Sequence, residues 1–287
     1  MPKVPYHLFR PEHLTSRVVF ASPHSGRDYP WSFLRHTVLD EHSIRSSEDA
    51  YVDRLFDCAP QFGAAFLKAG APRAFIDLNR APDELDPALV EGVRRSGHNP
   101  RVASGLGVVP RVVANGRAIY RGKLPFAEAE RRIRDYWHPY HATLQSALDD
   151  AHAAFGEALL IDCHSMPHEA VDGIARGGAR RPEIVIGDRF GASASPDFVE
   201  RIEAAFTAAG FAVSRNTPFA GAYITQHYGR PARRQHAVQI EIDRAIYMDE
   251  MRIRPNAQFH TVRKALRGII AEIAALGAPR IDSLAAE

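Results

Sequence analysis

The chain has 287 residues, of which 45% are hydrophobic and 24% are charged, as in an ordinary soluble globular protein. This length suits one large α/β domain or two small ones. The 36 Lys and Arg residues nearly balance the 34 Asp and Glu residues, and a net charge of +2 argues against binding to a nucleic-acid polyanion. No apolar run approaches the roughly 20 residues of a membrane span, and the first residues lack a signal-peptide core. We therefore expect a cytoplasmic protein.

Predicted strands and helices alternate along the chain. Short apolar runs predict strands at residues 17–21, 64–67, 74–77, 158–161, 183–188, 211–213 and 237–244. Amphipathic spacing predicts helical segments within residues 31–47 and at residues 50–56, 124–155, 196–209 and 256–276. This alternation predicts a mostly parallel α/β/α sheet. Because no repeat or interdomain linker is found, the simplest organisation is a single domain over residues 1–287.

Two segments depart from the regular pattern. Residues 96–122 carry many Gly and Arg residues among short β-like runs, and we interpret them as an irregular excursion with a hairpin that borders the site. Pro139 should kink or split the helix predicted over residues 124–155, because proline cannot donate a backbone hydrogen bond.

Histidines stand at the ends of two predicted strands. His24 follows the first strand within Ser22-Pro23-His24-Ser25-Gly26, and His164 ends the apolar run at residues 158–161. Ligands of open α/β sheets bind beyond the carboxyl ends of the strands, so we expect both histidines at one edge. One such histidine alone is more often a satisfied structural residue, but the repetition favours a metal site. Asp162 could orient the His164 ring.

Two histidines and one carboxylate are a typical protein ligand set of a catalytic zinc ion. Glu48 and Asp49 fall in the first turn of the helix predicted at residues 50–56, and either could supply the carboxylate. The alternative is that Asp49 only stabilises the helix dipole. We expect one zinc ion per chain, with another divalent ion left open; zinc polarises a carbonyl and makes hydroxide available near neutral pH.

Glu241 is anomalous because it lies within an otherwise apolar strand. Burial would raise its pKa and suit it to transfer protons to and from the reacting groups. The alternative is a structural pair with an arginine such as Arg244. Asp188 is the next candidate for the base.

Arg80, with Asn79 beside it, could bind a substrate carboxylate with its two-pronged guanidinium. The alternative is a structural arginine that holds the following loop at Asp83 or Asp86. Cys163, next to His164, could be a thiol nucleophile. Its setting in an apolar run instead favours burial as a small hydrophobic residue, and Cys58 and Cys163 follow no zinc, redox or disulfide spacing.

Several ordered motifs together resemble the N-formylglutamate amidohydrolase family over residues 18–250. They are Ser22-Pro23-His24-Ser25-Gly26, Asp77-Leu78-Asn79-Arg80, Asp162-Cys163-His164-Ser165-Met166-Pro167, Gly187-Asp188-Arg189-Phe190-Gly191 and Gln239-Ile240-Glu241-Ile242-Asp243-Arg244. That family is similar to zinc carboxypeptidases and aspartoacylases. The resemblance implies a three-layer α/β/α fold of the phosphorylase/hydrolase-like, zinc carboxypeptidase type, with a mixed, mainly parallel sheet.

The resemblance also implies roles for individual residues. His24, Asp49 and His164 would bind the metal, Asn79 and Arg80 the substrate, and Glu241 would be catalytic. The carboxypeptidase pattern His-x-x-Glu is absent, because Arg27 stands where its acid would be. Asp49 matches better than Glu48, because Tyr51-Val52 follow it as in the family. The family's frequent Gly-Gly loop reads Gly221-Ala222 here, which is expected to reshape the pocket slightly.

The activity implied is zinc-dependent hydrolysis of N-formyl-L-glutamate to formate and L-glutamate, a step of histidine degradation. The runner-up is a deacylase or carboxypeptidase-like enzyme that acts on another N-acyl amino acid or a small peptide. A non-catalytic binding module would leave Glu241 and the strand-end histidines unexplained. The expected partner is a small N-acyl amino acid, with no nucleic acid and no membrane, and the sequence leaves the oligomeric state open.

Overall fold

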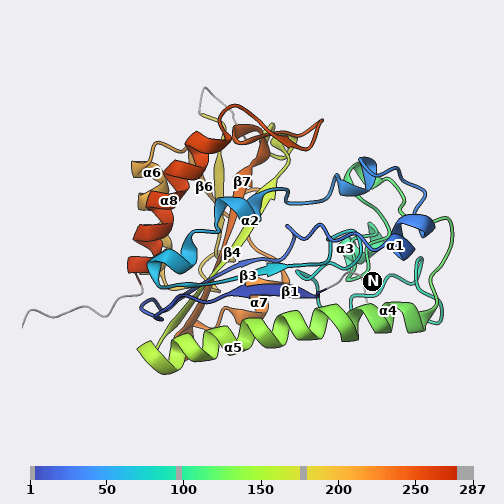
Figure 1. Cartoon of the computed structure of the whole chain (residues 1–287), viewed down its shortest axis with the longest axis horizontal. Helices are drawn as coiled ribbons and strands as arrows, with labels where there is room; N and C mark the ends of the chain where they lie inside the picture. The colour runs from blue at the N-terminus through green and yellow to red at the C-terminus, as the bar shows by residue number, and fades with distance from the viewer. Residues whose placement is uncertain (1–3, 95–98, 175–179, 277–287) are drawn as a thin grey trace, which may run out of the picture.

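A mixed sheet of seven strands organises the computed structural model, which describes residues 4–94, 99–174 and 180–276 (Figure 1). Its strands, in spatial order, are β1 (Tyr6–Phe9), β3 (Ala65–Ala69), β2 (Val18–Ser22), β4 (Ala158–Met166), β7 (Gln235–Asp243), β5 (Ile184–Gly187) and β6 (Val213–Arg215). Strands β3, β2, β4 and β7 are parallel, as are β5 and β6, whereas β1 and β5 run antiparallel to β3 and β7. The predicted mixed, mainly parallel sheet is confirmed. Outside it, β8 (Met248–Asp249) and β9 (Arg254–Pro255) form an antiparallel pair.

Helices cover both faces of the sheet. The α-helices are α1 (Trp31–His36), α2 (Val52–Leu55), α3 (Pro100–Ala103), α4 (Phe126–Arg132), α5 (His138–Phe155), α6 (Pro196–Ala208), α7 (Tyr223–Tyr228) and α8 (Phe259–Ala275). One apolar layer joins α2, α6 and α8 to the sheet, and a second joins α4, α5 and α7 to its other face. In Figure 1, α5 runs along the lower side and α6 and α8 lie at the upper left.

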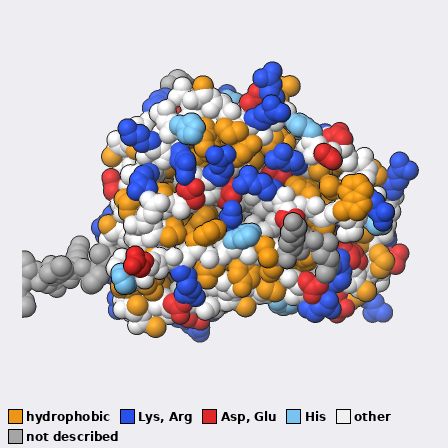
Figure 2. Space-filling view, viewed as in Figure 1, with side chains coloured by type: hydrophobic (Ala, Val, Ile, Leu, Met, Phe, Trp, Pro, Cys, Tyr) orange, Lys and Arg blue, Asp and Glu red, His pale blue; other side chains and the backbone are white. Residues whose placement is uncertain are grey.

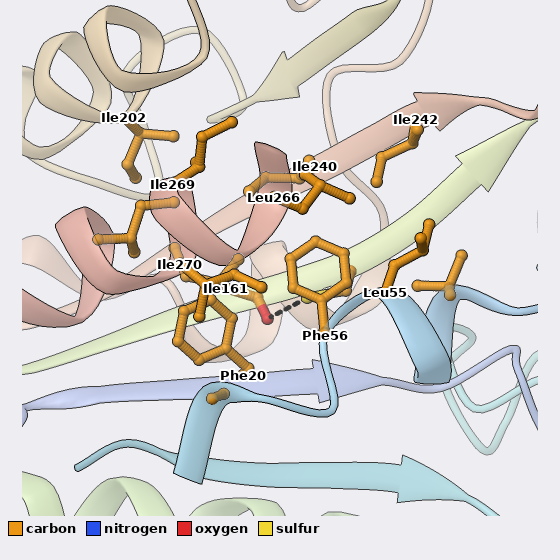
Figure 3. Packing of buried hydrophobic residues seen from close by; sticks show 14 of the residues in the cluster. Phe20, Leu55, Phe56, Ile161, Ile202, Ile240, Ile242, Leu266, Ile269 and Ile270 are labelled. Carbon is orange, nitrogen blue, oxygen red and sulfur yellow. Dashed lines mark hydrogen bonds between the residues drawn. The ribbon is translucent and has the colours of Figure 1, made fainter. Parts of the chain in front are cut away.

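The layer under α6 and α8 is built mainly from branched side chains. Figure 3 shows this packing, with side chains of α2, α6 and α8 directed at the sheet: Leu55, Ile202, Leu266 and Ile270 lie over Phe20, Ile161 and Ile240. Burying one such side chain contributes about 1.5–3 kcal/mol to folding. This layer fixes the positions of β2, β4 and β7, the strands that carry the site.

Strand β7 is apolar on one face and polar on the other near its carboxyl end. Val238, Ile240 and Ile242 belong to the layer under α6 and α8. Because side chains alternate along a strand, Gln239 and Glu241 face the opposite side. Strand β4 follows the same rule, with Ile161 and Cys163 in the apolar layer and Asp162 and His164 opposite. Glu241 is therefore not anomalous: it belongs to the polar face of a strand whose side chains alternate between two faces.

The helix predicted over residues 124–155 is interrupted where Pro139 predicted a break. Residues Ile133–Trp137 form a π-helical turn between α4 and α5. Pro139 has no N–H to donate to the carbonyl of Asp135, so the regular α-helical pattern cannot continue there. Helix α5 then ends at Gly156, which adopts a left-handed φ of 69°.

Some sequence predictions are wrong in detail. Residues 74–77 are a turn and not a strand: the amides of Phe75 and Ile76 donate to the carbonyl of Pro72. Their side chains are buried. The apolar run therefore indicated burial correctly but did not indicate a strand. Strand β4 extends to Met166, so His164 lies inside the strand near its end. Strand β1, a half-buried edge strand, and helix α7 were not predicted.

Two further predictions are refined. Asp49 precedes α2, because Tyr51 stands at the N-cap with a left-handed φ of 67°. From residue 99 onward, the excursion predicted over residues 96–122 contains α3 and a single antiparallel bridge between Val112 and Ala118; residues 96–98 lie outside the described part. None of the helices described is both long enough and apolar enough to cross a membrane. Basic, acidic and apolar side chains are interspersed on the face seen in Figure 2.

Candidate metal centre and active-site cavity

The fold brings His24, Asp49 and His164 together. Each offers one ligand atom, and these atoms all lie within 4.8 Å of one another. His164 Nδ1 is 2.9 Å from Asp49 Oδ2, and His24 Nδ1 is 3.4 Å from the same oxygen. All three residues are at most 2% exposed. The prediction that both histidines lie at one edge of the sheet is confirmed.

Local hydrogen bonds hold the loop that carries His24. This loop directly follows β2, and Ser22 Oγ donates to Ser25 Oγ across it at 2.8 Å. The Asp49 amide donates to the His24 carbonyl at 3.1 Å, so two segments distant in sequence are tied together. His164 needs no loop, because β4 itself presents it.

A carboxylate stands behind each histidine. His24 Nε2 is 2.7 Å from Asp77 Oδ1, and His164 Nε2 is 2.9 Å from Asp162 Oδ1. Both rings therefore direct Nδ1 toward Asp49 and Nε2 toward an acid. Such carboxylate–histidine pairs orient rings that bind metal ions and make them more basic. The orienting role predicted for Asp162 matches this geometry.

Asp49, and not Glu48, belongs to the group. Its Oδ1 accepts from Arg244 Nη2 at 3.0 Å, which leaves Oδ2 for the histidine side. Glu48 is occupied elsewhere: Oε1 accepts from the Tyr29 hydroxyl at 2.7 Å and from Arg45 Nε at 2.9 Å. The alternative role for Asp49 in stabilising a helix dipole loses support, because its carboxylate contacts His24, His164 and Arg244 instead.

The electrostatics of the group favour a cation. Burial alone would lower the pKa of His164, but the Asp162 and Asp49 carboxylates outweigh burial and raise this pKa well above its usual value. Burial would raise the pKa of Asp49, yet the neighbouring His164 and His24 rings outweigh burial and hold this pKa well below its usual value. Asp77 is likewise held ionised by Arg73 and His24 against burial.

The donor set fits a divalent metal ion. Two imidazole nitrogens and one carboxylate oxygen converge on one point, the combination found in catalytic zinc sites. The buried His24 Nδ1 has no hydrogen-bond partner among the described residues, which is costly for a polar atom unless a ligand satisfies it. The group could therefore hold a metal ion.

Glu241 lies next to this group on the neighbouring strand. In the parallel pairing of β4 and β7 it is in register with His164, so both side chains project from the same face. Its Oε1 accepts from Gln239 Nε2 at 2.9 Å. Burial raises the pKa of Glu241 to about 7. The alternative pair with Arg244 is not formed, because Arg244 binds Asp49 and Ser165.

Arg80 is buried but keeps hydrogen-bonding capacity. Its Nε donates to the Leu106 carbonyl at 2.9 Å and its Nη1 to the Asn79 carbonyl at 3.1 Å. No carboxylate in the described part of the chain lies at ion-pair distance from it. The loop pairing considered as the alternative is absent there: Asp86 binds Arg111 instead, at 2.7 Å.

Asn79 is more fully engaged. Its Oδ1 accepts from the Ile224 amide at 2.7 Å, and its Nδ2 lies 3.2 Å from His164 Nε2. This side chain connects the histidine to α7. Asn79 borders the cavity, but Arg80 has more free donors to offer a substrate.

A cavity of about 430 Å³ connects these residues. Its wall includes His24, Asp49, Asn79, Arg80, His164 and Glu241, so the structure brings all six predicted site residues to one cavity. The segment that contains Leu106 and Asn115 also borders it, as predicted for the excursion. A cavity of this size accommodates a small molecule.

Two alternative catalytic residues do not reach the cavity wall. Cys163 faces the apolar layer under α8, and burial raises its thiol pKa well above the usual value, so little reactive thiolate forms. Asp188 accepts from Asn216 Nδ2 at 2.6 Å in a neighbouring loop. Cys163 is therefore not positioned to attack a molecule bound in the cavity, and Asp188 is not positioned to exchange a proton with it.

Comparison with known proteins agrees with the geometry of the site. The family model described as N-formylglutamate amidohydrolase matches residues 16–248. The chain belongs to this family. It is 35% identical over 243 residues to an N-formylglutamate deformylase of Pseudomonas aeruginosa, a match that covers 82% of this chain and 83% of the relative. It is 32% identical over 240 residues to an N-formylglutamate deformylase of Pseudomonas putida, with coverage of 81% and 82%.

Solved structures agree with membership of the N-formylglutamate amidohydrolase family. The crystal structure of N-formylglutamate amidohydrolase from Ralstonia eutropha JMP134 matches with a TM-score of 0.88 at 35% identity, covering 96% of this chain and 98% of that one. A gene product of Agrobacterium tumefaciens matches with a TM-score of 0.66 at 16% identity over 96% of each chain, which shows a shared fold alone.

Four residues at or behind the cavity wall were given no site role from the sequence. Asp77 and Gln239 lie in motifs of the N-formylglutamate amidohydrolase resemblance, and their polar side chains next to assigned residues were an available signal. Arg244 ends one of those motifs but was considered only as a partner of Glu241. Arg73, which binds Asp77 at 3.0 Å and borders the cavity, carried no signal beyond its charge.

Proposed function

We propose that this protein is a zinc-dependent amidohydrolase that converts N-formyl-L-glutamate to formate and L-glutamate. The observation that supports this most strongly is the juxtaposition of His24, Asp49 and His164 with Glu241 in one cavity, within a chain of the N-formylglutamate amidohydrolase family. Similarity to the two Pseudomonas deformylases, at 35% and 32% identity, supports the choice of substrate.

In this proposal His24, Asp49 and His164 hold one zinc ion through Nδ1, Oδ2 and Nδ1. Zinc bound there polarises the formyl carbonyl and favours ionisation of a water molecule near neutral pH. Asp77 and Asp162 keep the two rings turned toward the ion, and Arg244 restrains the second oxygen of Asp49. A nitrogen- and oxygen-rich set supports zinc, although it also accommodates other divalent ions.

Arg80 and Asn79 form the substrate end of the site. Arg80 binds the α-carboxylate of the substrate with its free N–H groups, because a guanidinium matches a carboxylate with two parallel hydrogen bonds. Asn79 supports His164 and lies beside Arg80, so it links substrate recognition to the metal centre. The bound substrate is thereby oriented with its formyl group toward His24 and His164.

Glu241 transfers the proton. It accepts a proton from the water that attacks the formyl carbon and delivers it to the glutamate nitrogen as the C–N bond breaks. The products are formate and the free amino group of L-glutamate. A pKa raised to about 7 by burial allows both protonation states near neutral pH. A neighbouring dication acts in the opposite direction, so the pKa in the zinc-loaded protein is expected to lie below this value.

The acyl group and the amino acid are tested together by comparing rates. We would measure kcat/KM on zinc-loaded protein for N-formyl-, N-acetyl- and N-propionyl-L-glutamate and for N-formyl-L-aspartate. The proposal expects N-formyl-L-glutamate to be the best substrate. A higher kcat/KM for an acetyl or larger acyl group would instead favour the deacylase alternative, and no hydrolysis of any compound would refute the proposal.

The remaining expectations concern the setting of the activity. We propose that residues 1–287 form one catalytic domain, because the cavity wall draws on residues from His24 to Arg244. The cytoplasmic location expected above stays a prediction, as does a step of histidine degradation, which the sequence resemblance implies.

A further inference from the structure

Two of the four arginines on the cavity wall have no acidic partner. Arg73 binds Asp77 at 3.0 Å, and Arg244 binds Asp49 at 3.0 Å. Arg80 and Arg101 also border the cavity, but neither lies at ion-pair distance from a carboxylate of residues 4–94, 99–174 or 180–276. The cavity therefore presents two cations that a ligand can neutralise.

Arg101 is attached to the same backbone segment as Arg80. The Leu106 amide donates to the Arg101 carbonyl at 2.8 Å, and the Leu106 carbonyl accepts from Arg80 Nε at 2.9 Å. Burial lowers the pKa of Arg80; the charge of Asp77 raises this pKa, the positive charges of Arg73 and Arg101 lower it, and Glu84 raises it again. Two like charges held close together favour a ligand with more than one negative charge.

A second cavity of about 690 Å³ adjoins the first. Arg80, Arg101, Gly221 and Ala222 border both cavities, and Arg189 borders the second. A Cβ at Gly221 would lie 3.3 Å from Arg189 Cγ, so the Arg189 side chain lies against this common wall. Glu84 is also on the second wall, but its two oxygens accept from the Ala81 amide at 2.9 Å and from Asn99 Nδ2 at 3.0 Å.

The loop that carries Arg189 is held in a strained conformation. Arg189 and the following Phe190 have φ values of 54° and 57°, in the left-handed region. Each such residue costs on the order of 1–3 kcal/mol and persists only where its surroundings impose it. Here the Arg189 amide donates to the Ala220 carbonyl at 2.8 Å, and Asn216 binds both the amide and the carboxylate of Asp188. These hydrogen bonds hold the Arg189 backbone beside the common wall in spite of the strain, and the catalytic assignment leaves the Arg189 side chain without a role.

We propose that Arg101 and Arg189 form a second carboxylate subsite, which selects N-acyl amino acids that have an acidic side chain. This inference rests on the proposed function, in which Arg80 takes the α-carboxylate. The side-chain carboxylate of glutamate lies a few ångströms from the α-carboxylate, so it needs a second cation beside Arg80. A site built to bind a charged group discriminates strongly against an analogue that lacks it, because its own charges are then left unpaired.

The test compares an acidic substrate with its neutral isostere. We would measure kcat/KM for N-formyl-L-glutamate and N-formyl-L-glutamine with the wild-type protein, Arg101→Met, Arg189→Met and the double variant. The ratio of the two values should exceed about 30 in the wild type and fall about 10- to 100-fold in the double variant, the range expected for lost charge-assisted hydrogen bonds. Each single variant should lose part of the preference.

Arg230→Met is the matched control. Arg230 borders only the second cavity and donates from Nε to the His227 carbonyl at 3.0 Å. This variant removes one positive charge from the same region, so it reports the long-range contribution of net charge. The ratio should change less than about threefold, because exposed charges are screened at physiological salt.

A binding measurement separates this inference from the proposed function. We would titrate zinc-loaded protein with glutarate and with valerate by calorimetry. Tighter binding of glutarate, lost in the Arg101→Met Arg189→Met variant, would support the subsite even if N-formyl-L-glutamate were not hydrolysed. The subsite is overturned if the wild type hydrolyses both formyl substrates equally well, or if the double variant keeps the full preference for the acidic substrate and for glutarate.

Discussion

The candidate metal centre and the arginine end of the cavity differ in how far their charged side chains are already paired. At the metal centre each histidine already has an acid at Nε2 and faces Asp49 with Nδ1. At the other end, Arg80 and Arg101 have no acidic partner in the described part of the chain. The protein thus fixes in advance the groups that could hold a metal ion, where small errors in position are costly, and leaves without an acidic partner the groups proposed to bind the substrate.

The largest effect is expected from removal of the histidines that are proposed to bind the metal ion. His24→Ala or His164→Ala should each abolish stoichiometric zinc binding, because two remaining ligands cannot enclose the ion. The chain should still fold, since the apolar layers are untouched. Metal content after gel filtration, with circular dichroism for folding, checks this.

His236→Ala is the control, because His236 is also buried but pairs with Glu157 at 3.1 Å near the start of β7. It should keep one zinc ion per chain. Full zinc content in both His24→Ala and His164→Ala would show that these histidines do not bind the metal ion.

The acids behind the histidines sharpen the claim that the metal centre is fixed in advance. Asp77→Asn keeps the shape of the side chain but removes the charge that faces His24 Nε2. We expect zinc affinity or activity to fall about 10- to 100-fold, as for other partners of metal-binding histidines. Competition with a fluorescent chelator measures the affinity.

Asp53→Asn provides the matched comparison, since Asp53 is equally buried but binds Arg27 and Lys68. Equal effects of the two substitutions on zinc affinity would mean that Asp77 acts only through general stability.

A substitution of Arg80 tests the arginine end of the cavity, where no acidic partner is found among the described residues. Arg80→Lys replaces a planar fork by a point charge, so KM for N-formyl-L-glutamate should rise about tenfold while kcat changes little. Steady-state kinetics separate the two constants. An unchanged KM with a lower melting temperature would instead show that Arg80 has a structural role. Arg111→Lys is the control and should give that result, because the Arg111 side chain binds Asp86.

Cys163 should show the smallest effect. It lies one residue from His164 but faces the apolar layer, so Cys163→Ala should leave kcat within about threefold of the wild type. The lost packing is expected to cost about 1 kcal/mol, which lowers the melting temperature by about 2–4 °C. A drop in kcat of a hundredfold or more, with zinc retained, would support Cys163 as a nucleophile.

Local patterns predicted most of the fold and drew attention to the residues that are proposed to react. An apolar run gave β7, and helical spacing gave α5, α6 and α8, because burial leaves a trace in the sequence. His164 and Glu241 could be found for the same reason: a polar residue stands out in an apolar strand. The run at residues 74–77 misled because a buried turn and a buried strand have the same composition.

Properties that depend on tertiary contact could not be predicted from local patterns. Those patterns left Glu48 and Asp49 open as the carboxylate, and only the resemblance to the family favoured Asp49, because adjacent residues in sequence differ only in the direction of their side chains. The antiparallel pairing of β5 with β7 leaves no local signature. The free state of Arg101 and the paired state of Arg73 are equally invisible in sequence, since each depends on a neighbour distant in the chain.

In the proposed function, Glu241 moves the proton beside a metal ion held by His24, Asp49 and His164. Glu241→Gln preserves size and can still contact Gln239, but it cannot exchange a proton. The direct measurement is kcat for N-formyl-L-glutamate on Glu241→Gln protein shown to contain one zinc ion. We predict a fall of about 10²- to 10⁴-fold with KM little changed. A zinc-loaded Glu241→Gln enzyme with nearly wild-type kcat would contradict the account.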